Sequence, residues 1–338
     1  MHLGLRFLIP SRLRKLAILT PFYLRRPMQT LDSHFAELTP QRHLITGGTG
    51  FIGTALVQQL LRQGHPVTLW VRDPAKAQRR FGQGVRCVTS LDELAADDTF
   101  DTVINLAGAP IVGPPWTAGR RAQLLASRVG VTLGLLTWLA RTAQKPSTWL
   151  QASAIGFYGV RPPEEALTEH SAAGAGFMSE LCVKWEAAAA QANAMGVLRQ
   201  VTLRLGVVLG KGGALPPLLL PIRLGLGGRM GDGRQMFSWI HLHDVLAIMA
   251  TALQDGTMQG VYNTVAPDVV SQGEFAVTAG QVLHRPVWLP LPAWVLRLPM
   301  GEMAQLFVDG QRVVPARLQA QGFVFAYPEL LGALKDLA

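Results

Sequence analysis

The sequence contains few of the residues that build disulfide or metal scaffolds. Only 2 of its 338 residues are cysteine. Cys87 and Cys182 lie far apart, without a Cys-x-x-Cys pair or a Cys/His cluster nearby, so we expect neither a disulfide framework nor a zinc site. Unpaired cysteines fit the reducing environment of a cytoplasmic protein.

Acidic residues are also scarce, with 22 Asp and Glu against 31 Lys and Arg, which gives a net charge of +9. Clustered positive charge would indicate a nucleic-acid partner. Residues 1–30 hold six basic residues and no acidic one, so this short segment carries six of the nine net charges. We therefore predict no nucleic-acid partner.

The basic N-terminal segment lacks an apolar run long enough to span a membrane, which needs about 20 residues. Its run Leu16–Thr20 is ended by Pro21 and is soon followed by Arg25. A basic amphipathic segment could rest on a membrane surface. The preferred interpretation is an extension, residues 1–41, ahead of the folded domain, because Met28 offers an alternative start.

From residue 43 the pattern becomes that of a strand, a turn, a helix and a second strand. His43–Thr46 is a short apolar run, and Thr54–Arg62 carries apolar residues at helical spacing before it ends at Gly64. Pro66–Val71 is rich in β-branched residues and predicts the second strand. The sequence therefore predicts a βαβ unit.

Further predicted strands and helices alternate along the chain. The strands are Thr102–Ala107, Trp149–Ser153 and Gln200–Val208, and the helices between them are Arg120–Thr142 and Ser179–Met195. Such alternation predicts an α/β fold with a Rossmann-type, doubly wound parallel sheet. No repeat or low-complexity linker interrupts it.

Proline and glycine become frequent after residue 215, which predicts a smaller lobe beside the sheet. We expect residues 42–285 to form the dinucleotide-binding domain, with insertions of the substrate lobe after 215. Residues 286–338 are expected to form a small C-terminal domain. A substrate cleft would lie between sheet and lobe.

The glycine-rich turn after the first strand predicts a dinucleotide site made of Gly47, Gly48, Thr49, Gly50, Phe51, Ile52 and Gly53. Gly47 would permit the tight turn, Gly50 would let backbone amides approach a pyrophosphate, and Gly53 would allow close packing of helix on strand. The N-terminus of the following helix would then face the negative charge.

The residue after the second strand decides which dinucleotide is preferred. A guanidinium there binds the 2′-phosphate of NADP, whereas a carboxylate binds the ribose hydroxyl of NAD. Arg72 stands at this place, so NADP(H) is the favoured cofactor. Asp73 follows directly and keeps NAD(H) as the alternative.

The motifs resemble those of extended short-chain dehydrogenases/reductases, which use Rossmann folds. The glycine turn and Asn105-Leu106-Ala107-Gly108 carry the general resemblance. The chain is more specifically similar to the atypical "epimerase family" branch that includes the bacterial YfcH proteins, through the motifs Ser153–Gly159, Lys184–Glu186, Arg204–Gly210, Ser238–His241, Asn263–Pro267 and Gly322–Phe325. The resemblance covers roughly residues 42 to 337 and implies that Leu106, Ala107 and Gly108 also line the cofactor.

The resemblance also implies a catalytic Ser with a Tyr-x-x-x-Lys pair, and here the sequence departs from it. Ser153 matches the serine, but the tyrosine and lysine positions fall on Met178 and Cys182. Neither side chain can replace a phenol or an ammonium group. Tyr158 remains a candidate acid–base residue, with a pocket-wall role as the alternative.

The arginine that binds the substrate diphosphate in nucleotide-sugar relatives is replaced by Phe237, so a nucleotide sugar is disfavoured as the substrate. Arg234 lies in the same loop at another offset and offers weak compensation. His241 and His243 form a His-x-His pair without a third ligand at suitable spacing, and we expect no metal.

Together these features predict an NADP(H)-binding oxidoreductase or epimerase-like enzyme that acts on a small molecule, with Ser153 and Tyr158 as its catalytic candidates. The rival interpretation is a non-catalytic NADP(H)-binding sensor or scaffold, which the missing Tyr-x-x-x-Lys pair favours. A nucleotide-sugar epimerase is the third interpretation.

Overall fold

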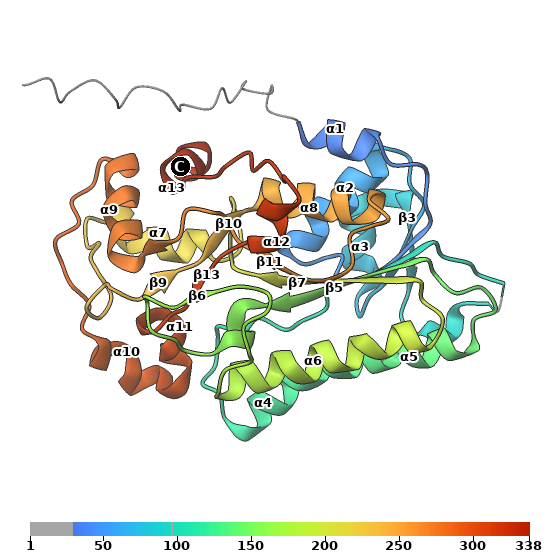
Figure 1. Cartoon of the computed structure of the whole chain (residues 1–338), viewed down its shortest axis with the longest axis horizontal. Helices are drawn as coiled ribbons and strands as arrows, with labels where there is room; N and C mark the ends of the chain where they lie inside the picture. The colour runs from blue at the N-terminus through green and yellow to red at the C-terminus, as the bar shows by residue number, and fades with distance from the viewer. Residues whose placement is uncertain (1–29, 96) are drawn as a thin grey trace, which may run out of the picture.

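The computed structural model describes residues 30–95 and 97–338, and Figure 1 shows a central sheet between two layers of helices. The interpretation of residues 1–29 as an extension lies outside the described residues.

All seven strands of the main sheet run parallel, in the order β11-β7-β5-β4-β1-β2-β3. They are β1 (His43–Thr46), β2 (Val67–Trp70), β3 (Val85–Val88), β4 (Thr102–Asn105), β5 (Thr148–Ala154), β7 (Arg199–Leu205) and β11 (Gly260–Thr264). Most of their residues are buried, as in a sheet covered by helices on both faces, and the exposed residues Arg86 and Gly260 lie on the two edge strands β3 and β11. The predicted Rossmann-type α/β fold is confirmed.

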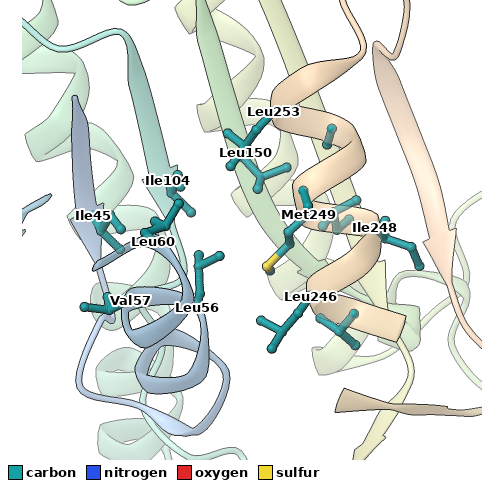
Figure 2. Packing of buried hydrophobic residues seen from close by; sticks show 14 of the residues in the cluster. Ile45, Leu56, Val57, Leu60, Ile104, Leu150, Leu246, Ile248, Met249 and Leu253 are labelled. Atoms are coloured by element: carbon teal, nitrogen blue, oxygen red, sulfur yellow. The ribbon is translucent and has the colours of Figure 1, made fainter. Parts of the chain in front are cut away.

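One face of the sheet is covered by α2 (Phe51–Arg62), α3 (Pro74–Phe81) and α8 (Leu242–Gln254). Figure 2 shows Leu60 of α2 beside the strand residues Ile45 and Ile104, while α8 contributes Leu246, Met249 and Leu253. Leu56 and Val57 lie four and three residues before Leu60, so they join it on the buried side of α2. This layer fixes the start of α2 against β1.

The opposite face is covered by α5 (Val131–Arg141) and α6 (Phe177–Ala194), which lie side by side below the sheet in Figure 1. Helix α5 continues α4 (Ala118–Leu125) through the π-helical turn η3 (Ala126–Gly130). The continuous helix 118–141 is long and apolar enough to cross a membrane by length and composition alone.

The N-terminal boundary of the fold lies before residue 42, which corrects the predicted extension of residues 1–41. Helix α1 (Leu31–Ala36) packs against α2 and α8. Phe35 is fully buried in the main core, and Leu38 is also buried. Burial of an aromatic ring contributes several kcal/mol, so residues 31–38 belong to the domain.

The C-terminal lobe shares its core with the preceding segment. Leu330, Leu334 and Leu337 of α13 (Leu330–Leu337) pack with residues of α7 (Leu215–Arg223) and α9 (Gln272–Leu283). Residues 286–338 therefore do not enclose a core of their own.

Short elements connect the larger ones. They are η1 (Gly82–Gly84), η2 (Leu91–Glu93), η4 (Ile155–Tyr158), β6 (Ala166–Leu167), β8 (Val207–Leu209), β9 (Met236–Phe237), β10 (Trp239–His241), β12 (Val270–Ser271), α10 (Ala293–Met300), η5 (Gly301–Ala304), α11 (Gln305–Val308), β13 (Arg312–Val313) and α12 (Ala316–Ala320).

Candidate functional site

The glycine turn lies where the strand order reverses. Strand β1 is followed by β2 on one side and has β4 on the other, so the crossovers after β1 and β4 leave the sheet in different directions. Ligands of open α/β sheets bind at the carboxyl ends of the strands at such a point. Here those ends carry Gly47 after β1 and Leu106 after β4.

Two glycines of the turn are required by the packing of the chain itself. Gly47 has φ of +70°, and a Cβ atom there would lie 2.4 Å from the Leu106 carbonyl oxygen. A Cβ atom on Gly53 would lie 2.2 Å from the Gly47 carbonyl oxygen, because α2 packs directly against the turn. The tight turn and the close helix packing predicted for these two glycines are both present.

Gly50 differs from the other two, because a Cβ atom there would meet only the Gly47 carbonyl oxygen, at 3.1 Å. Gly50 is the N-cap of α2, and no side chain caps this helix. The first amides of a helix lack partners within it and attract an anion. With Gly48, Thr49, Phe51 and Ile52 completing the turn, this arrangement fits a dinucleotide pyrophosphate.

Arg72 and Asp73 differ in what they do at the end of β2. Arg72 is exposed and forms no ion pair within residues 30–95 and 97–338. The Asp73 carboxylate caps α3 by accepting a hydrogen bond from the Lys76 amide at 2.9 Å. Arg72 therefore has its full set of donors available for a ligand, whereas one Asp73 oxygen is already engaged.

Arg80 is a residue of this region that sequence reasoning missed. Its guanidinium donates to Thr54 Oγ1 at 2.7 Å and to the Thr49 carbonyl oxygen at 3.2 Å. It lies eight residues after Arg72, in the last turn of α3. The helical spacing could have placed it near the glycine turn only if the packing of α3 had been known.

The end of β4 is held by a buried amide network. Asn105 accepts a hydrogen bond from the Thr46 hydroxyl at 2.6 Å and donates to Thr132 and Gln151 at 2.9 and 3.0 Å. These bonds tie β1, β4, α5 and β5 together next to the carboxyl ends of β1 and β4. Leu106, Ala107 and Gly108 follow, and the backbone of Leu106 and Ala107 lies against Gly47 of the turn.

Ser153 lies at the carboxyl end of β5 and is engaged in a buried ion-pair network. Its hydroxyl donates to Glu186 Oε1 at 2.6 Å. Arg204 of β7 holds the same carboxylate through two bonds, of 2.9 and 2.8 Å. The Arg204 and Glu186 side chains are only 5% and 14% exposed, so this pair is an interior one.

Tyr158 is fully buried within the same network. Its hydroxyl donates to Asn263 Oδ1 at 2.7 Å and accepts from Arg204 at 2.9 Å. Burial raises the pKa of this phenol, although Arg204 partly opposes the shift. The hydroxyl is thus bonded on both sides within the interior, next to the cationic Arg204.

Met178 and Cys182 of α6 pack against the turn after β5. A Cβ atom on Gly156 would lie 3.0 Å from Met178 Cε and 3.8 Å from Cys182 Sγ. Burial and the nearby Glu186 raise the pKa of the Cys182 thiol to about 12. Lys184 is exposed, so within α6 no ammonium group faces this turn.

Phe237, which replaces a substrate arginine in the expected pattern, belongs to the core of the lobe. Its ring lies 4.6 Å from that of Phe275. Arg234 is exposed on the preceding loop. Trp116 and Trp239 are buried in separate core clusters and so serve packing.

His241 and His243 take part in the start of α8 and in the packing around Tyr327. His241 Nδ1 accepts the His243 amide at 3.0 Å, which caps α8, and the His241 ring stacks on Tyr327 at 3.9 Å. In the described part of the chain, no group of three or more His, Cys, Asp or Glu side chains could hold a metal ion.

A surface hollow of about 690 Å³ shares Glu186 with the Ser153 network. It is lined by α6 residues from Glu186 to Asn193 and by the edge of the sheet at β7 and β11. None of the glycine-turn residues takes part in it.

Comparisons with known proteins agree with this geometry. The NAD dependent epimerase/dehydratase family matches residues 43–264, and a domain of unknown function, DUF1731, matches residues 291–337.

Three relatives show how far the similarity extends. The epimerase family protein SDR39U1 of Mus musculus is 41% identical over 88% of this chain and 99% of its own. The epimerase family protein YfhF of Bacillus subtilis is 38% identical over 87% of this chain and 96% of its own. The crystal structure of human SDR39U1 with NADPH superposes with a TM-score of 0.78 at 39% identity, over 88% of this chain and 99% of the human one.

Proposed function

Because the chain belongs to the NAD dependent epimerase/dehydratase family, we propose that it binds NADP(H) in the crevice between β1 and β4 and uses it in an oxidoreductase or epimerase-like reaction on a small molecule. Within the family we propose the atypical extended branch that the YfcH proteins exemplify. The observation that carries the proposal is the glycine turn at the strand-order reversal, with its uncapped helix and the space beside Gly50. The NADPH bound by human SDR39U1 supports it.

Cofactor preference follows from Arg72 in this proposal. An exposed guanidinium without an ion-pair partner can form charge-assisted hydrogen bonds to a 2′-phosphate. Asp73 caps α3, so its carboxylate is less available for the ribose hydroxyl that defines NAD selectivity. NADP(H) is the favoured cofactor and NAD(H) the alternative.

The chain itself would bind and orient the reactants. The bound nicotinamide supplies the hydride chemistry. The amides at the start of α2 bind the pyrophosphate, and the Asn105 network keeps β4 and β5 in register beneath it. Ser153 is the hydroxyl that we place toward the substrate, and Tyr158 forms the wall behind it.

NADPH oxidation with a panel of aldehydes and ketones tests the catalytic proposal. We expect oxidation with at least one compound and its loss in Ser153→Ala. Tyr158→Phe should retain turnover if the tyrosine is a wall residue, whereas its loss would restore the acid–base role. No oxidation of tightly bound NADPH by any compound would contradict the enzyme proposal.

A non-catalytic NADP(H) sensor or scaffold is the second candidate. Met178 and Cys182 favour it, because a thioether and a buried thiol with a raised pKa cannot supply the missing acid–base pair. Binding without turnover is the result that selects it.

The proposal also covers the class of substrate and the location of the protein in the cell. Phe237 is packed on Phe275, so this position offers no cation for a diphosphate, and we propose a substrate other than a nucleotide sugar. The two cysteines are free, which fits a cytoplasmic protein.

A further inference from the structure

Arg128 lies in the π-helical turn η3, which interrupts an otherwise continuous helix of 24 residues. Such turns are rare in proteins, and those that occur often lie at functional sites. This turn faces the segment that follows β4, on the side of the crevice away from Arg72.

Side chains of the π-helical turn bind both the amide and the carbonyl group of Ala109 in that segment. The Ala109 amide donates to Ser127 Oγ at 3.0 Å, and Arg128 donates to the Ala109 carbonyl oxygen at 3.1 Å. A Cβ atom on Gly108 would lie 3.0 Å from the Arg128 guanidinium carbon. The guanidinium therefore lies directly against the backbone of a residue predicted to line the cofactor.

Arg128 is a partly buried cation without an anionic partner. Across residues 30–95 and 97–338, no carboxylate comes within 4.0 Å of its guanidinium. Its other bonds are long ones to Ser127 Oγ at 3.3 Å and the Leu124 carbonyl at 3.4 Å. Desolvation lowers its pKa. A desolvated cation without a counter-charge is unfavourable, and a bound oxyanion would relieve it.

The surroundings place this charge on the β4–β5 side of the site. The guanidinium lies 5.3 Å from the centre of the Trp185 ring of α6, one turn after Cys182. Arg72 marks the opposite, β2 side, where the adenosine half would bind. A dinucleotide crossing the turn thus brings its second phosphate and nicotinamide ribose toward Gly108.

We propose that Arg128 binds an oxyanion of the nicotinamide half of the dinucleotide, its second phosphate. This inference rests on the proposed NADP(H) binding and adds a residue that neither motif nor spacing indicated. It gives the crevice a cation at each end, with Arg72 for the adenosine half and Arg128 for the nicotinamide half.

Two ligands separate the halves in calorimetric titrations of the full chain. NADPH carries both halves, whereas adenosine 2′,5′-bisphosphate carries only the adenosine half with its 2′-phosphate. We expect Arg128→Gln to weaken NADPH about ten- to a hundredfold and to leave adenosine 2′,5′-bisphosphate within about twofold. Arg128→Lys keeps the charge, so its NADPH affinity should fall less than that of Arg128→Gln.

Arg141→Gln is the matched control, because it removes the same charge from the same helix about 20 Å further along. It should leave both affinities unchanged. If Arg128→Gln fails to fold, Arg128→Met takes its place, because it removes the charge but keeps a long unbranched side chain, and it should weaken NADPH selectively.

Equal NADPH affinity in the wild type and Arg128→Gln would overturn the inference, as would an equal loss for both ligands. Failure of the wild type to bind either ligand would instead overturn the proposed function.

Discussion

On the β1–β2 side of the crevice, Arg72 is exposed and Gly50 borders free space, whereas on the β5–α6 side the polar groups are bonded to one another in the interior. Ser153, Glu186, Arg204 and Tyr158 form one buried network. The first side keeps its donors available for a ligand. On the second side, most donors and acceptors of these four residues are bonded to one another, so the two sides differ in how many polar groups remain available to a ligand.

The sharpest test of this contrast is a pair of glycine substitutions. Gly50→Val should leave a folded chain and reduce NADPH affinity below detection, because the side chain enters the space proposed for the pyrophosphate. Gly53→Val should instead impair folding, since its Cβ would lie 2.2 Å from a backbone oxygen. Circular dichroism and NADPH titration distinguish the two, and unchanged binding by Gly50→Val would remove the glycine turn as the site.

The next largest effect is expected on the opposite side. Arg204→Met leaves the Glu186 carboxylate buried and unpaired, so the free energy of unfolding should fall by about 3–5 kcal/mol. Urea unfolding measures this loss. The double variant Glu186→Gln/Arg204→Met should recover part of it, because no uncompensated charge remains. A loss below about 1 kcal/mol would mean that the pair behaves like a surface one.

Removal of Arg72 should have a smaller effect, confined to one ligand. Arg72→Ala is expected to weaken NADPH by about ten- to a hundredfold, the value of a lost charge-assisted bond, and to leave NADH nearly unchanged. Arg79→Ala removes an exposed guanidinium from α3 and serves as the control. If Asp73→Ala is the damaging change and NADH the affected ligand, the assignment of Arg72 is wrong.

A further effect depends on pH and concerns the amino end of β1, opposite the site. Burial and the neighbouring His65 lower the pKa of His43 to about 3. The unfolded chain then binds more protons than the folded one between about pH 6.5 and 3. The free energy of unfolding is therefore highest above pH 6.5 and decreases as the pH falls. Urea unfolding should show a decrease of about 1.4 kcal/mol per pH unit from His43 below pH 6.5. His43→Gln should remove this contribution, and an unchanged slope in that variant would contradict it.

The sequence predicted the sheet and the turn because their signals are local. The run His43–Thr46, the glycines and the helical spacing of Thr54–Arg62 each act over a few residues. Strands β3 and β11 were missed, since Val85–Val88 alternates weakly and Gly260–Thr264 begins at a glycine. The role of Phe35 was missed for another reason, because its burial depends on the packing of α1 against α2 and α8.

The backbone geometry of the glycine turn was predictable because the motif specifies it, and Gly47 and Gly53 pack as expected. The role of Arg72 stays a prediction. Arg80 and Arg128 contact Thr54 and Ala109 from helices whose packing no local pattern specifies. The burial of Tyr158 likewise depends on Asn263, which lies 105 residues away in the sequence.

The relative affinity of the unmodified protein for NADPH and NADH decides whether Arg72 selects the cofactor. With the Arg72 donors available and Asp73 engaged as a helix cap, NADPH should bind about ten- to a hundredfold more tightly in calorimetric titrations at one ionic strength. NADH that binds at least as tightly as NADPH would contradict it.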